Sequence, residues 1–190
     1  MKRGSISRHL FIALLLMALL SCRNHTDPLK TRSRFFVVPH AESYPGFNGH
    51  LSWYGRERAG ALGKLLSDSG VARIYVTPYS RTLETADSLR LLKQIDTAVY
   101  LLDTSGQELV SAIKANQDYG RTLLVVGHPF AVPGILESLG VSGDKVSAAD
   151  TLPNVLYEVN NDHGKVQMNA IRFGPPVMAD TTRPADTLAR

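Results

Sequence analysis

Two histidines and an arginine follow apolar stretches of the chain, where their side chains could act on a phosphoryl group. His40 follows Phe35–Val38, His128 follows Thr122–Val126, and Arg81 lies just beyond a third apolar stretch. A guanidinium binds phosphate oxygens in pairs, and a neutral imidazole can attack phosphorus. Together the three residue types are typical of a site for phosphoryl transfer.

Other roles are open to the two histidines. They could hold zinc, but zinc needs a third ligand, and the sequence has no HExxH or similar spacing. The only cysteine, Cys22, lies far from both histidines, so the sequence offers neither a thiol nucleophile nor a cysteine-based zinc site. Either histidine alone could also be a core residue that bonds to the backbone.

Alternating strands and helices must position these residues. Apolar stretches predict strands at residues 35–38, 73–77, 99–102 and 122–126. Amphipathic patterns predict helices at residues 52–69, 80–92, 105–116 and 130–139. Two late strands, at 155–159 and 166–173, flank an Asn-Asp-His-Gly turn at 161–164. This alternation predicts an α/β fold, a three-layer α/β/α sandwich around a largely parallel sheet.

The ends of these elements carry their own signals. Pro39 lacks a backbone N–H, so we expect it to end the pairing of the first strand. Ser52 is expected to cap the first helix, with Leu62, Leu65 and Leu66 on its apolar stripe. The carboxyl ends of parallel strands meet at one sheet edge, which predicts that His40, Arg81 and His128 share one crevice.

Four segments resemble, in order, the motifs of the histidine phosphatase superfamily, also called the phosphoglycerate mutase-like family. The family's Arg-His-Gly-Glu is similar to Pro39–Glu42, and its Leu-Thr-x-x-Gly-x-x-x-Ala is similar to Leu51–Ala59. Its Ser-Pro-x-x-Arg-x-x-x-Thr-Ala is similar to Thr77–Ala86, and its Val-Gly-His matches Val126–His128. The resemblance spans residues 34–173.

The resemblance implies a role for each candidate residue. His40 would be the nucleophile that becomes phosphohistidine, and Arg81 would hold the phosphoryl oxygens. His128 would be a second residue of the phosphate pocket and would donate to the developing charge. A small phosphorylated substrate is implied, with no metal and no organic cofactor.

The chain departs from the family pattern at two places. Pro39 replaces the motif arginine, and Pro129-Phe130 replaces a Ser-Asn pair. Losing one donor of this kind costs roughly 10²–10³ in rate in comparable sites. Either another basic group substitutes, with Arg56 or His50 as candidates, or the domain binds a phosphorylated ligand or a partner protein without turnover. A phosphomonoesterase is our first expectation, and the catalytically degenerate binder is the alternative.

The general acid is another open assignment. Family members often take this proton donor from the loop after the third strand, where Glu108 lies. Glu108 could equally be an acid that stabilises the dipole of its helix. Glu42 and Glu84 are further carboxylates near the motifs.

The amino terminus predicts export and a lipid anchor. Lys2, Arg3 and Arg8 precede the apolar run Leu10–Leu20, and Leu19–Cys22 resembles the bacterial lipobox. We expect a signal peptide (1–21), a tether (22–33), a histidine phosphatase-like domain (34–174) and a disordered tail (175–190). Lipidation of Cys22 would make the protein a cell-envelope lipoprotein, on the periplasmic side of a bacterial membrane or at the cell surface.

Composition argues against nucleic acid as a partner. The chain has 190 residues, 44% of them apolar, which fits one globular domain. Its formal net charge of +4 falls to +1 when the first 21 residues are removed. No basic run is interleaved with aromatic residues. We therefore expect contact with the membrane through the lipid alone.

Overall fold

A computed structural model describes residues 31–146 and 151–177. The predicted signal peptide, Cys22, most of the tether and residues 178–190 of the tail lie outside the described residues. The strands are β1 (Ser33–Pro39), β2 (Arg73–Val76), β3 (Thr97–Val99), β4 (Thr122–Gly127), β5 (Val155–Asp162) and β6 (Lys165–Arg172). The helices are α2 (Trp53–Leu66), α3 (Ser80–Lys93), α4 (Gln107–Ala115) and α5 (Val132–Ser138), with short 3₁₀ turns at Pro129–Ala131 and Gly143–Lys145. Within the described ranges, no helix has the length and apolar character needed to cross a membrane.

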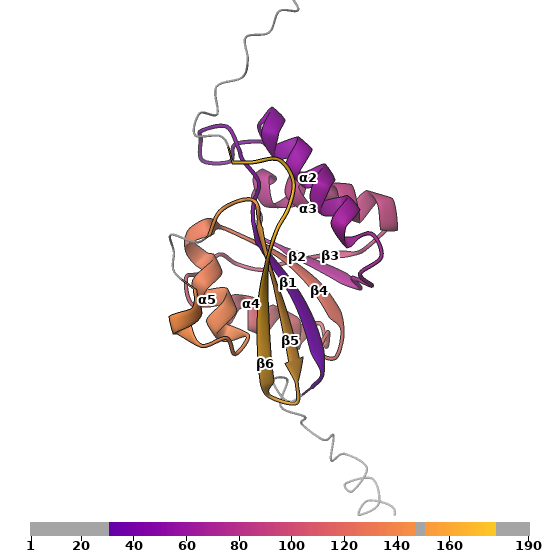
Figure 1. Ribbon diagram of the computed structural model, residues 1–190, viewed down its shortest axis with the longest axis vertical. Helices are drawn as coiled ribbons and strands as arrows, with labels where there is room; N and C mark the ends of the chain where they lie inside the picture. Colours follow the sequence, from indigo (N-terminus) through magenta and orange to yellow (C-terminus); the bar gives the residue numbers. More distant parts are fainter. Residues whose placement is uncertain (1–30, 147–150, 178–190) are drawn as a thin grey trace, which may run out of the picture.

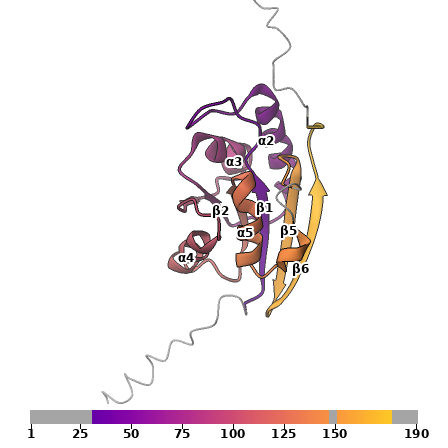
Figure 2. The same cartoon turned by 90° about the vertical axis from the view of Figure 1, so that its left-hand side faces the viewer.

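One six-stranded sheet, in the order β3-β2-β4-β1-β5-β6, forms the centre of the domain (Figure 1). Strands β3, β2, β4 and β1 run parallel to one another, whereas β5 pairs antiparallel with β1 and β6 antiparallel with β5. Figure 2 shows the β5–β6 hairpin along one side of the molecule. The largely parallel sheet and the antiparallel edge hairpin predicted from the sequence are both confirmed.

Helices cover both faces of the sheet because successive residues of each buried strand point to opposite sides. On one face, Phe36 and Val38 pack with residues of α2 and α3. On the other, Phe35 and Val37 pack with residues of α4 and α5. These two clusters are the two halves of the core, and they confirm the three-layer α/β/α sandwich.

Local sequence accounts for the start of α2 and for the hairpin. The hydroxyl of Ser52 accepts a hydrogen bond from the Gly55 N–H, which caps α2 as predicted. At the β5–β6 turn, His163 and Gly164 both have positive φ, 54° and 89°. Two consecutive residues of that kind match the twist of a tight hairpin.

Sequence expectations for the first helix and the third strand need correction. Helix α2 ends at Leu66, and Leu65 is 45% exposed, because it lies off the buried stripe. Strand β3 occupies Thr97–Val99 rather than 99–102. Beyond β3, the Tyr100 N–H still donates to the Val76 carbonyl at 3.0 Å, and the Tyr100 hydroxyl bonds to the Val126 carbonyl at 3.2 Å.

Pro39 does not end the pairing of β1 with β4. Pro39 is in register with Gly127, and the His40 N–H donates to the Gly127 carbonyl at 2.8 Å. The N–H groups of a strand alternate in direction, so the one that Pro39 lacks would point toward β5. There the register stops at Val37 and Tyr157. The proline therefore limits only the antiparallel side of β1.

Candidate active site

The carboxyl ends of three neighbouring strands bring the sequence-predicted residues together. β4 lies between β1 and β2, and all three run parallel. His40 follows β1, His128 follows β4, and Arg81 lies in the first turn of α3, after β2. The rings of His40 and His128 meet edge to face with centroids 5.2 Å apart. The two imidazoles predicted to meet beyond the strand ends are thus in contact.

The ring of His40 is oriented by its own backbone neighbour. Nδ1 lies 2.8 Å from the Ala41 carbonyl, which can only accept, so Nδ1 carries the proton. The neutral ring therefore has its lone pair on Nε2. The Ala41 peptide is fixed in turn, because its N–H donates to the Thr85 hydroxyl at 2.9 Å. Burial lowers the pKa of His40 below 6.5, and the Arg81 charge adds to the effect, so the ring is neutral at pH 7.

His128 is buried and is held by a chain of hydroxyls. Its Nε2 lies 3.0 Å from the Thr77 hydroxyl, which lies 3.0 Å from the Thr82 hydroxyl. The Thr82 hydroxyl donates to the carbonyls of Thr77 and Tyr79, each at 2.8 Å, and so can only accept from Thr77. The Thr77 hydroxyl therefore donates its one hydrogen bond to Thr82 and accepts a hydrogen bond from the His128 ring.

This chain places the proton of neutral His128 on Nε2 and leaves the lone pair on Nδ1. Burial is the main cause that lowers the pKa of His128 to about 4, and the nearby positive groups His40 and Arg81 contribute to the same shift. A bound phosphoryl dianion would favour a second proton on the ring, because an opposite charge stabilises the imidazolium.

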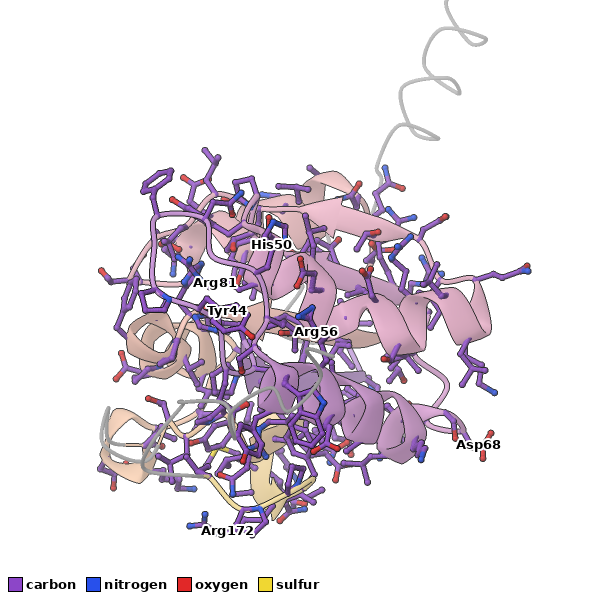
Figure 3. The ribbon with its side chains drawn as sticks, turned by 90° about the horizontal axis from the view of Figure 1, so that it is seen from above. Tyr44, His50, Arg56, Asp68, Arg81 and Arg172 are labelled. Atoms are coloured by element: carbon purple, nitrogen blue, oxygen red, sulfur yellow. The ribbon has the colours of Figure 1, made fainter. Side chains whose placement is uncertain are left out.

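Arg81 is anchored at the mouth of the site. Its Nη1 donates to the Phe47 carbonyl at 3.1 Å, and its guanidinium lies over the Tyr79 ring, 4.9 Å from the centroid. Figure 3 looks down on this edge of the sheet and labels Arg81 in the same region as Tyr44 and His50. The remaining donors of the guanidinium fork are suited to a ligand with paired oxygens.

Glu42 has a structural partner. Its carboxylate forms a two-pronged ion pair with Arg58 of α2, with Nε donating at 2.8 Å. The Arg58 side chain is 1% exposed and also donates to the carbonyls of Phe173 and Pro175. Gly55 permits the close approach of α2, since a Cβ there would lie 2.0 Å from the Glu42 carbonyl oxygen. Glu42 is thus committed to joining the loop after β1 to α2.

His50 and Arg56 do not replace the missing motif arginine through a direct contact. The Glu84 carboxylate accepts from His50 and from the Leu51 N–H. Burial alone would raise the pKa of Glu84, but these hydrogen bonds and the charge of Arg56 hold it below its usual value. Arg56 is exposed on α2 and lines a cavity of about 350 Å³ with Leu51 and Glu84. In the described structure, neither basic residue bonds to His40, Arg81 or His128.

Glu108 is exposed in the first turn of α4. No hydrogen bond or ion pair connects its carboxylate to His40, Arg81 or His128 in the part of the chain that the structure describes. Its position in that first turn is one where a carboxylate stabilises the helix dipole. The role of Glu108 as general acid stays a prediction.

Three residues of the site were missed by sequence reasoning. Thr77 and Thr82 orient His128, and Arg58 holds Glu42. The hydroxyls lie within the Thr77–Ala86 motif, so their proximity to the second strand end was the available signal. Arg58 carried none, because an arginine on a helix is usually solvated. Within residues 31–146 and 151–177, no group of three or more His, Cys, Asp or Glu side chains is arranged to hold a metal ion.

The strand order and the helices on both faces define the phosphoglycerate mutase-like fold. No family model and no curated protein sequence matches the chain. Among solved structures, a protein assigned as phosphohistidine phosphatase SixA from Agrobacterium tumefaciens is similar at 21% identity and a TM-score of 0.57, over 75% of this chain and 97% of that one.

Two further solved structures show the same fold. A SixA assignment from Nakamurella multipartitia is similar at 16% identity and a TM-score of 0.53, over 77% of this chain and 98% of that one. The mycobacterial glucosyl-3-phosphoglycerate phosphatase is similar at 13% identity and a TM-score of 0.53, over 76% of this chain and 100% of that one. At these identities the comparisons establish the shared fold.

Proposed function

We propose that this protein is a phosphomonoesterase that acts through a phosphohistidine on His40. The observation that carries the proposal is the tautomer of His40, whose Nδ1–H is held by the Ala41 carbonyl and whose Nε2 is left as a nucleophile. His128 and Arg81 stand beside it, and known phosphatases have the same fold.

In the first step, Nε2 of His40 attacks phosphorus and forms the N–P bond while the ester P–O bond breaks. The electron pair of that bond leaves with the alcohol oxygen, which takes a proton. In the second step, water attacks the phosphohistidine, inorganic phosphate leaves, and the N–P electrons return to Nε2. The Ala41 carbonyl holds the Nδ1–H throughout, which stabilises the positive ring of the intermediate.

Arg81 and His128 supply charge stabilisation in this mechanism. Arg81 pairs with two phosphoryl oxygens through its free N–H groups. His128 donates from Nδ1 once the phosphoryl charge has drawn a second proton onto the ring, while Nε2–H stays on Thr77. Phosphoryl transfer depends mostly on such positioning and charge stabilisation.

The alternative is a domain that binds a phosphorylated ligand or protein without turnover. Pro39 favours it, because a proline supplies neither a donor nor a charge where the motif has an arginine. The two functions differ in one measurable respect, the appearance of a covalent N–P bond.

The test is incubation of the full chain with p-nitrophenyl phosphate and a metal chelator. We expect slow hydrolysis, acid-labile phosphate on the protein, and loss of both in His40→Ala. His163→Asn is the matched control, since it removes a histidine from the far hairpin turn at a positive φ that asparagine tolerates. Full hydrolysis by His40→Ala would contradict the enzyme proposal. A wild-type protein that binds vanadate without hydrolysing the ester, and that loses this binding in Arg81→Gln, would favour the binding protein.

A further inference from the structure

Four rings lie in a row along the candidate active site. Phe47 meets Tyr79 with centroids 5.7 Å apart, Tyr79 meets His128 at 5.1 Å, and His128 meets Phe130 at 5.6 Å. His40 adjoins the row through His128. The catalytic edge of the sheet therefore has a continuous aromatic border.

The two ends of this row face solvent. Phe47 is 86% exposed and Phe130 is 58% exposed. Exposed apolar surface beside a polar site commonly marks a place where a ligand binds, and these two rings are linked to the site through Tyr79 and His128. Phe130 stands where the family motif has a polar residue, so the border has become apolar at the phosphate pocket itself.

The exposed ring of Phe47 is held in place by its backbone. The Phe47 carbonyl accepts from Arg81, and the neighbouring Asn48 side chain accepts from the Ser80 N–H at 2.7 Å. These bonds tie the loop after β1 to the start of α3. The Phe47 ring and the guanidinium that we assign to the phosphoryl oxygens therefore both contact the ring of Tyr79.

The carboxylates around the site bear on the leaving group. Glu42 is occupied by Arg58, Glu84 by His50 and the Leu51 N–H, and Glu108 has no contact with the histidines in the described structure. In the described structure no hydrogen bond joins any of these three carboxylates to His40. A phenol ionises near pH 10, as tyrosine does, whereas an alkyl hydroxyl resembles water with a pKa of about 16. Expulsion of an aryl oxide thus needs far less help from an acid.

We propose that the substrates of this site are monophosphate esters of aromatic alcohols, with the aryl ring packed against Phe47 and Phe130. The inference rests on the proposed phosphatase function and specifies its substrate class. Transfer to His40 breaks the aryl P–O bond, the electron pair leaves on the aryl oxide, and that oxide takes its proton from water. Water then releases inorganic phosphate from His40 as described above.

Phosphonates test the proposal without any turnover, because their C–P bond is not hydrolysed. The dissociation constants of benzylphosphonate, cyclohexylmethylphosphonate and methylphosphonate are measured by calorimetry on the full chain. One aromatic contact is worth about two- to tenfold in affinity. We expect benzylphosphonate to bind about tenfold more tightly than methylphosphonate and more tightly than its cyclohexyl analogue.

Variants assign this preference to the two rings. Phe47→Ala and Phe130→Ala should each reduce the ratio of benzyl to methyl affinity by two- to tenfold, while methylphosphonate affinity stays within twofold. Leu91→Ala is the matched control, because Leu91 is 65% exposed near the far end of α3. It should leave every affinity unchanged.

The failures of the two proposals can be told apart. Equal binding of benzyl- and methylphosphonate, or a benzyl preference that survives in both phenylalanine variants, overturns the aryl specificity while the phosphate site stands. Absence of binding by all three phosphonates overturns both proposals. Arg81→Gln should weaken all three alike, which marks the phosphate site independently of the rings.

Discussion

The hydroxyl of Thr77 lies 3.0 Å from Nε2 of His128 and accepts a hydrogen bond from the Nε2–H group. The acceptor role follows from Thr82, whose proton is directed to backbone carbonyls. A threonine that ends one strand thereby determines which nitrogen of the imidazole on the next strand is free. Thr77 is a positioning residue, since it acts through His128.

Replacing Thr77 tests this relationship. Thr77→Val keeps the shape of the side chain but leaves the buried Nε2–H of His128 without an acceptor. Loss of comparable orienting bonds at metal-bound histidines costs about 10- to 100-fold, and we expect a similar fall in kcat/KM for p-nitrophenyl phosphate. Thr77→Ser should restore most of the rate. Equal activity of the valine and serine variants would contradict the role of the hydroxyl.

The rate of hydrolysis should depend on pH through His40. Attack requires the neutral ring, and burial together with Arg81 lowers the pKa of His40 below 6.5. The plot of kcat/KM against pH should therefore be flat near neutrality and fall on acidification, with a midpoint below 6.5. In Arg81→Gln the midpoint of this acidic fall should move to a higher pH, because the positive charge that lowers the pKa of His40 is gone. A midpoint that moves down in this variant would contradict the assignment.

Breaking the Glu42–Arg58 pair should destabilise the fold. Glu42→Gln leaves the guanidinium of Arg58, 1% exposed, without its charged partner. Removing one member of a buried pair costs about 3–5 kcal/mol, and we expect a loss of about 3 kcal/mol in the free energy of unfolding in urea. The double variant Glu42→Gln/Arg58→Met should lose less than the sum of the single variants. Strict additivity would show that the pair contributes no coupling.

Restoring the motif arginine should increase turnover. Pro39→Arg adds a donor and a charge next to His40, and such a donor is worth up to about 10²–10³ in rate. Steady-state kcat with p-nitrophenyl phosphate measures the gain. Pro39→Met controls for side-chain length without charge. An arginine variant no faster than the methionine variant, with its melting temperature unchanged, would show that Pro39 is not what limits the rate.

The lipid anchor is tested separately from the enzymology. We propose that Cys22 is lipidated after export, and that this holds the protein at the cell envelope. Cys22→Ser should release the domain into the soluble exported fraction or leave an unprocessed precursor. Fractionation of a bacterial host followed by immunoblotting distinguishes these outcomes. Membrane association identical to wild type would remove the lipoprotein proposal.

Residues with a local signal were the ones that sequence reasoning placed well. The apolar stretch before His40 and the one before His128 could only be buried strands, and parallel strands bring their carboxyl ends to one edge. The turn around Gly164 predicted the hairpin. Ser52 marked the start of α2 because its hydroxyl serves the first turn of its own helix.

Features that depend on contacts between distant segments were not predictable in the same way. Arg58 reads as a surface charge until the loop after β1 and the chain after Phe173 both close on it. Strand β3 is only three residues long and lies at the edge of the sheet. The prediction followed the apolar residues and placed the strand at 99–102 instead of Thr97–Val99. Pro39 was expected to end all pairing, but a proline removes hydrogen bonds on one side of its strand only.

The direction of β1 places the amino-terminal end of the described domain at the sheet edge opposite the histidines. Thr31, the first described residue, precedes the start of β1, and His40 follows its end, so the seven residues of the strand separate them by about 20 Å. A lipid on Cys22 would be attached to the domain from the edge of the sheet opposite the histidines. The two histidines would then lie on the side of the domain away from that attachment, where phosphate esters diffuse in the aqueous compartment.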